Sequence, residues 1–161
     1  MDLLTHIFLP LIFLFAIGRF KKRYILFSPA SMIPDLDKLF LVGFLHSLFI
    51  ILPILIAAAA LEKKLRNSLE ISSILSFFIL SHLFLDILDG GPVAIAYPLS
   101  SLGIGVSFNA KIFVSNLTVS DLIPDVEIRE IRASESYGLF SGFGFASMIL
   151  FLLMLFKAKS R

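Results

Sequence analysis

The chain has 161 residues, of which 58% are hydrophobic and 16% are charged, and its mean hydropathy is +0.96. Soluble domains are nearer half apolar and a quarter charged, so the composition favours a single membrane domain over residues 1–161. The formal charge of +2 is too small to indicate a nucleic-acid partner, and the absence of cysteine excludes disulfides and thiolate metal ligands, which leaves imidazole and carboxylate for a transition-metal site.

Four apolar runs approach the length of roughly 20 helical residues that crosses a bilayer core. They comprise Leu3–Ile17, Leu39–Leu61, Ile71–Leu88 and Leu139–Phe156. The first run is short enough to tilt or to insert only in part, and it lacks the basic segment and the cleavage site of a signal peptide, so we expect a retained anchor. The short loop Glu62–Glu70 makes the second and third runs antiparallel neighbours. We therefore expect an all-α integral membrane helical bundle of about four spans.

Two segments outside these runs have a different character. Tyr24–Pro34 is apolar but only about half a span long and contains two prolines, which predicts a broken or re-entrant element that protein must bury. Gly103–Thr118 is rich in β-branched and aromatic residues around a turn-like Asn109-Ala110. Because Gly90-Gly91-Pro92 ends the third run, we expect a small β-rich extramembrane insert within residues 90–138.

The three histidines, His6, His46 and His82, all lie within the apolar runs. An ionisable residue inside a span is expensive and is by default a functional hypothesis. For one such histidine a hydrogen-bonded packing role is an equal alternative, but the whole set favours a site. His82 and Asp86 are four residues apart, which puts an imidazole and a carboxylate on one helical face.

Positions along the apolar runs predict that these side chains lie at the same depth in the membrane. His46 lies seven residues into the second run and His82 lies seven residues before Asp89, so both are about 10 Å deep at 1.5 Å per residue. Asp35 and Asp37 directly precede the second run and arrive at the same membrane face. We expect Asp2, Asp37 and Asp89 to be solvated caps rather than primary ligands, as is ordinary for acidic residues at span ends.

A set of short motifs resembles a known family. In order, the motifs are Thr5-His6, Pro34-Asp35-Leu36-Asp37, His46-Ser47, Ser81-His82 with Leu85-Asp86, Gly90-Gly91-Pro92 and Tyr97-Pro98. Across roughly the first hundred residues this set resembles the YdjM/YbcI-like family of membrane-bound metal-dependent hydrolases. The family often has Thr where Leu45 stands here, and an Arg beside the second histidine that this chain does not carry.

The same order of residues is similar, more distantly, to the zinc-dependent phospholipase C and S1/P1 nuclease superfamily. That similarity implies that Asp35, His46, His82 and Asp86 hold one divalent metal ion. It also implies a second ion on His6, Asp86 and the amino terminus of the chain. The histidines needed for a third ion are absent, so at most two are expected, with Zn²⁺ favoured and Mn²⁺ or Fe²⁺ as alternatives.

The distribution of basic residues indicates an orientation. His6 can join Asp35 and His46 only if Tyr24–Pro34 returns the chain to its starting face. Ten of the 14 basic residues then share one side, which the positive-inside rule makes cytoplasmic. These ten are Arg19, Lys21, Lys22, Arg23, Lys63, Lys64, Arg66, Lys157, Lys159 and Arg161. The metal site would face outward, together with a weak glycosylation sequon at Asn116.

We therefore expect a multi-pass hydrolase of the cell membrane that acts on phosphoester or lipid-like substrates at the external face. The metal would lower the pKa of a water molecule that attacks a phosphoryl or acyl centre, while Asp37 or Asp89 orients that water or the histidine rings. The alternative is a non-hydrolytic metal-binding protein such as a divalent-cation transporter, although the cytoplasmic halves of the second and third spans have only serine as polar lining. A purely structural anchor would leave the aligned His and Asp residues unexplained, and no oligomeric state is indicated.

Overall fold

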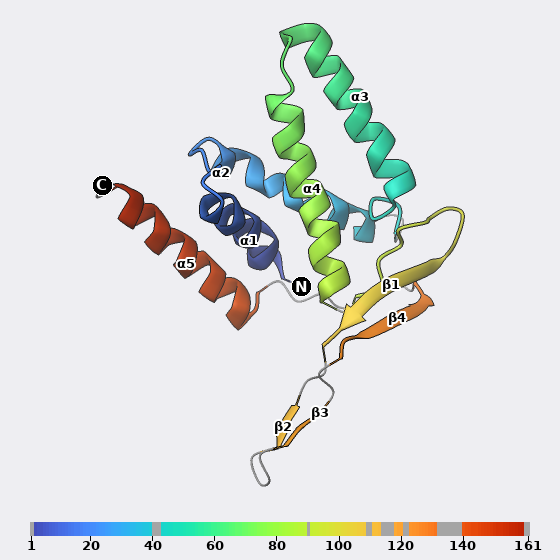
Figure 1. Cartoon of the computed structure of the whole chain (residues 1–161). Helices are drawn as coiled ribbons and strands as arrows, with labels where there is room; N and C mark the ends of the chain where they lie inside the picture. The colour runs from blue at the N-terminus through green and yellow to red at the C-terminus, as the bar shows by residue number, and fades with distance from the viewer. Residues whose placement is uncertain are drawn as a thin grey trace.

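The computed structural model describes residues 2–39, 43–89, 91–108, 111–113, 118–120, 123–131 and 140–159. Within these ranges the protein is mostly helical, with five α-helices and a small β portion (Figure 1). The helices are α1 (Leu3–Ala16), α2 (Tyr24–Phe27), α3 (Leu48–Arg66), α4 (Glu70–Leu88) and α5 (Gly142–Lys159), with the 3₁₀ helices η1 (Ser28–Met32) and η2 (Pro34–Leu39) between α2 and α3. Among the described residues, α4 is the one helix long and apolar enough to cross a membrane, whereas α1 and α5 contain shorter apolar stretches.

Asp2 fixes the beginning of α1 and its contact with α5. One carboxylate oxygen accepts hydrogen bonds from the backbone N–H of Leu4 at 3.0 Å and of Thr5 at 3.2 Å, as an N-cap residue does. The other oxygen accepts from the Thr5 hydroxyl at 2.8 Å and from the Ser141 hydroxyl, directly before α5. Asp2 is thus a cap as expected, but it is buried, so its expected solvation is wrong. Gly144 of α5 faces the same point, where a Cβ would lie 2.9 Å from the Leu4 Cβ. The absence of a side chain therefore lets the two helices approach closely, and they lie side by side in Figure 1.

The segment after α1 is broken into short pieces, as the sequence predicts. α2 has a single turn, and η1 and η2 follow it with a proline at or near the start of each. Proline fits these positions because its missing N–H would have no helical partner there. η1 packs against both α1 and α4, so protein contacts cover this interrupted backbone.

The expected second span is wrong at its beginning. We expected a helix over Leu39–Leu61, but α3 begins only at Leu48. Gly43 has φ of +91°, in the left-handed region, and the chain turns there before the helix starts. His46 therefore lies in the turn that precedes α3 and not inside a span, so the estimate of its depth from helical rise is also wrong.

The hairpin of α3 and α4 is antiparallel, as predicted from its short loop (Figure 1). Asn67 ends α3 in the left-handed conformation, with φ of 52°. The Glu62 carboxylate reaches from α3 to the first turn of α4, where it accepts hydrogen bonds from the backbone N–H of Ile71 at 3.0 Å and of Ser72 at 2.6 Å. This side chain supplies the cap that α4 lacks at its own N-cap position.

Two groups of buried apolar side chains hold the helices together. The first joins α1, α4 and α5 through Leu11, Leu14, Ile74, Phe78 and Phe151. The second joins α3 and α4 to the segment after α4 through Ile51, Ile79, Leu83 and Val93. α4 contributes to both groups, so it is the central helix of the bundle.

The expected β-rich insert is present. Strand β1 (Leu102–Ser107) pairs with β4 (Asp125–Glu130), and β2 (Lys111–Phe113) pairs with β3 (Thr118–Ser120), both antiparallel. Val93 and Ile104 exchange two backbone hydrogen bonds of 3.0 Å, which fix the insert to the segment that follows α4. The expected turn at Asn109-Ala110 lies outside the described residues.

Candidate metal centre

Four side chains converge at the end of the bundle where α1 begins. They are Asp35 from η2, His46 from the turn before α3, and His82 and Asp86 from the last two turns of α4. The His82 Nε2 atom lies 3.2 Å from Asp35 Oδ1 and 3.2 Å from Asp86 Oδ2. His46 Nε2 lies 3.6 Å from Asp35 Oδ1, 3.3 Å from Asp86 Oδ2 and 3.4 Å from His82 Nε2. The predicted primary ligand set is therefore brought together.

The spacing of these four atoms fits a tetrahedral metal ion. Zinc binds imidazole nitrogen and carboxylate oxygen at about 2.0–2.2 Å, which separates tetrahedral ligand atoms by roughly 3.3–3.6 Å. Five of the six separations run from 3.2 to 3.6 Å, and all four atoms lie within 4.8 Å of one another. Two imidazoles and two carboxylates also form the donor set that a site without thiolates requires. Both the spacing and the donors thus suit a divalent transition metal.

Asp37 supports the site through His46. Its Oδ2 atom lies 2.9 Å from the His46 Nδ1 atom and accepts a second hydrogen bond, of 2.8 Å, from the backbone N–H of Leu45. An Nδ1–H that donates to a carboxylate leaves Nε2 free of a proton and aimed at the common point. Asp37 is only 3% exposed, so its expected role as a solvated cap is wrong.

His6 contacts the site from α1. Its Nε2 atom lies 3.1 Å from Asp86 Oδ1, the oxygen that faces away from the other three ligands. The His6 and His82 rings stack with their centroids 4.0 Å apart, and both side chains are buried. This contact requires the chain to return between α1 and α3 to the end of the bundle where α1 begins, and the broken segment after α1 makes that return.

Access to the four ligands is uneven. The two imidazoles are buried, whereas the side chains of Asp35 and Asp86 are 22% and 14% exposed. Lys38 forms an ion pair with Asp35 and thus places a positive charge at this opening. Asp89, at the C-cap of α4, is exposed and is not one of the four clustered residues. We expected Asp89 to be a solvated residue at the end of a span, and its exposed position fits that expectation.

Sequence reasoning missed how the turn that carries His46 is held. Ser47 donates its hydroxyl hydrogen to the carbonyl oxygen of Tyr97, and the backbone N–H of Leu48 donates to the carbonyl of Ile95 at 3.1 Å. The presence of His46-Ser47 and Tyr97-Pro98 in one motif set was the available signal, but spacing alone gives no reason for the two to meet. The segment after α4 therefore positions the start of α3 beside the ligands.

The basic clusters lie at the opposite end of the helices. Lys21 and Arg23 form ion pairs with Glu70, the first residue of α4, and the Lys21 Nζ to Glu70 Oε1 distance is 2.6 Å. The hydrogen bond to Glu70 raises the pKa of Lys21 above its ordinary value. Ala158, near the end of α5, lines a cavity together with Gly18 at this same end. The basic residues after α1, around the α3–α4 loop and at the end of α5 thus share one end.

These features define a helical protein with a cluster of histidine and aspartate side chains that can hold a metal ion. Two of the four side chains come from α4, the described helix that is long and apolar enough to cross a membrane. The chain belongs to the YdjM inner membrane protein family, whose model matches residues 1–160. This match confirms the resemblance seen in the motifs and extends it beyond the first hundred residues. No curated protein and no solved structure matches the chain.

Proposed function

We propose that this protein is a membrane-bound metal-dependent hydrolase that acts on phosphoester or lipid-like substrates. The observation that carries the proposal is the convergence of Asp35, His46, His82 and Asp86, whose ligand atoms lie within 4.8 Å of one another, with partial exposure of the two carboxylate side chains. A structural site is usually closed, whereas a catalytic site keeps a position for water or substrate. The exposed side of the cluster supports the catalytic alternative.

The residues around the cluster have distinct proposed roles. A bound divalent ion, with Zn²⁺ favoured, would supply Lewis-acid polarisation and lower the pKa of water toward neutrality. Asp37 holds the His46 ring in its ligating tautomer. His6 holds the second oxygen of Asp86 and is the residue available to a second ion. Lys38, at the opening, provides a positive charge for an anionic substrate group.

We further propose that the protein crosses the membrane several times, with the metal centre toward the external face. Gathering of the basic clusters at the end remote from the ligands supports this orientation, because cytoplasmic ends carry the excess of Lys and Arg. Lipid headgroups and water would then reach the cluster from the side of the β-rich insert. The substrate class follows from this location and from the distant superfamily similarity.

A divalent-cation transporter is the alternative function. Such a protein needs polar groups along a path through the bilayer. On α4, however, the buried residues on the basic side of His82 are Ile74, Phe78 and Ile79, with Ser72 engaged by Glu62 near the far end. Within the described part of α4, this apolar stretch favours hydrolysis over conduction.

The test combines metal analysis with hydrolysis. Purified wild-type protein should carry about one equivalent of zinc and hydrolyse a fluorogenic phosphodiester or phospholipid, whereas His82→Ala should lose both properties. Asp125→Asn, an exposed carboxylate change in β4, is the matched control and should retain both. Metal retained by His82→Ala would overturn the site, and a metal-loaded wild type without activity on either substrate class would favour the non-hydrolytic alternative.

A further inference from the structure

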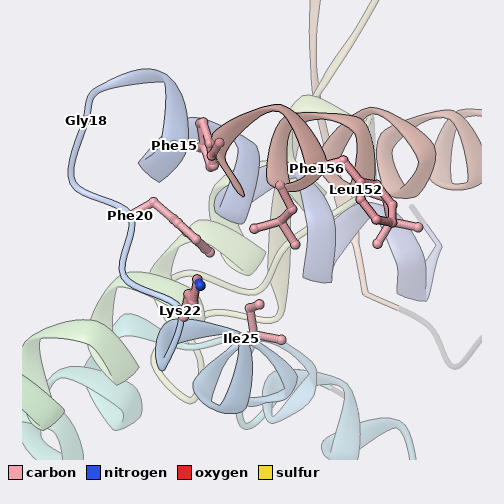
Figure 2. A pocket seen from close by; sticks show the side chains of 9 residues that line it. Phe15, Gly18, Phe20, Lys22, Ile25, Leu152 and Phe156 are labelled. Atoms are coloured by element: carbon pink, nitrogen blue, oxygen red, sulfur yellow. The ribbon is translucent and has the colours of Figure 1, made fainter. Parts of the chain in front are cut away.

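A second feature lies at the basic end of the bundle, away from the metal centre. A cavity of about 580 Å³ opens between the end of α1, the connector that follows it, α2 and the end of α5. Figure 2 shows its labelled walls, which are the side chains of Phe15, Phe20, Ile25, Leu152 and Phe156. Its volume is within the range of roughly 300–1,000 Å³ that small-molecule sites occupy. An apolar space of this size suits a hydrocarbon chain.

One charged side chain lines this apolar cavity. Lys22 extends from the connector, and Figure 2 places its nitrogen between Phe20 and Ile25. Its neighbours Lys21 and Arg23 turn the other way and pair with Glu70. No ion pair of Lys22 is found in the described part of the chain, so its charge is available to a ligand.

A second cavity, of about 400 Å³, lies on the other side of Phe20. It shares Gly18 and Phe20 with the first cavity, and its walls include Arg19 and Tyr24. The connector thus presents Lys22 to the first cavity and both Arg19 and Lys21 to the second, where Lys21 pairs with Glu70, which also lines that cavity. Apolar space beneath a cationic rim is complementary to a phospholipid, in which a glycerol joins the acyl chains to an anionic phosphate.

We propose that this end of the protein binds one anionic phospholipid, with an acyl chain in the cavity beside Leu152 and the headgroup phosphate on Lys22. A protein of an inner-membrane family has such lipids around it, and a basic rim attracts them because the cytoplasmic leaflet carries negative surface charge. The choice of leaflet rests on the orientation proposed above. Lipid binding itself does not depend on that orientation. It is also independent of hydrolysis, because the candidate metal ligands lie at the opposite end of the bundle.

The experiment measures lipid retention by native mass spectrometry. Protein in mild detergent is mixed with phosphatidylglycerol or with phosphatidylcholine of the same acyl chains. Lys22→Gln removes the cation of the rim, and Lys64→Gln removes an exposed cation of α3 that lines neither cavity. Leu152→Trp fills the apolar cavity, and Leu153→Trp places the same bulk on a neighbouring residue of α5 that is 60% exposed.

Wild-type protein should retain one phosphatidylglycerol molecule in preference to phosphatidylcholine. Lys22→Gln should weaken retention by roughly fivefold, the effect of one basic residue near a charged membrane surface, and Leu152→Trp should abolish it. Lys64→Gln and Leu153→Trp should behave as wild type. Equal retention of both lipids would overturn the proposal, and so would equal effects within either pair of variants. It would also be overturned if the protein formed a dimer that Leu152→Trp dissociates, because a second copy of the chain would then occupy the cavity. Thermal unfolding in detergent serves as the folding control, and loss of metal binding in His82→Ala should leave lipid retention unchanged.

Discussion

Two kinds of side chain make up the candidate metal centre. Some offer ligand atoms to the common point, and others orient those ligands. Asp37 belongs to the second group because it contacts His46 Nδ1 and not the common point of the four ligand atoms. A carboxylate in this position fixes the ring and raises its basicity, and its loss typically costs 10–100-fold in metal affinity. Its buried environment, 3% exposed, makes the hydrogen bond less accessible to water than a surface pair.

Asp37→Asn should therefore weaken zinc affinity by about tenfold without removing the site, because the amide keeps the shape of the side chain but not its charge. Competition with a chelating dye measures this change. His46→Ala should lose far more affinity, since it removes a ligand, and Asp125→Asn should lose none. Identical affinities for Asp37→Asn and wild type would show that His46 is oriented by the turn alone.

Much of the site was predictable at the residue scale, and the reason is its spacing. The pair His82 and Asp86 sits one helical turn apart within a long apolar helix, so helix geometry alone puts both on one face. The burial of Asp37 was not predictable, because it depends on a turn at Gly43 that brings the backbone of Leu45 over the carboxylate. Local sequence therefore predicts which residues share a helix face, but it does not predict which groups a folded turn brings together.

At the scale of elements, apolar composition located α4 within one residue at its start and at its end, because charged or small residues bound that helix on both sides. The same criterion failed for α3. The apolar run continues through the residues before Leu48, so hydropathy does not register the turn that precedes the helix. The pairing of β1 with β4, and not with its neighbour β2, also depends on contacts distant in sequence.

The packing of α1 on α5 gives a test at this scale. Gly144→Ala should destabilise the protein by roughly 1–3 kcal/mol, because the added methyl group would meet Leu4 and the Asp2 carboxylate. Gly142→Ala is the matched control in the same helix, since nothing lies within 4 Å of a Cβ there. Thermal unfolding in detergent measures both variants. A shared melting temperature would mean that the two helices separate easily at this contact.

For the whole molecule, the arrangement of charge predicts which parts face the same compartment. Because the native chain has no cysteine, single cysteines report their position without a background signal. Arg19→Cys, Lys64→Cys and Lys157→Cys should react with a membrane-impermeant maleimide from the cytoplasmic side only. Ile123→Cys, in the insert and 82% exposed, should react from the external side. Labelling of the three basic positions from different sides would contradict the proposed orientation. The glycosylation sequon at Asn116, expected on the external side, lies outside the described residues.

The position of the ligands along the chain also bears on how the protein is made. Every residue that contacts the candidate ion lies between His6 and Asp86, and the segment that braces the start of α3 ends at Tyr97. Helix α5 contacts the bundle through Phe151 in the first buried group, and the hydrogen bond between Ser141 and Asp2 holds its start; both contacts are separate from the four ligands. Since chains fold from the N-terminus during synthesis, the ligand cluster can assemble before α5 has left the ribosome. Docking of α5 against α1 would then follow the assembly of the candidate ligand cluster and would not be needed for it.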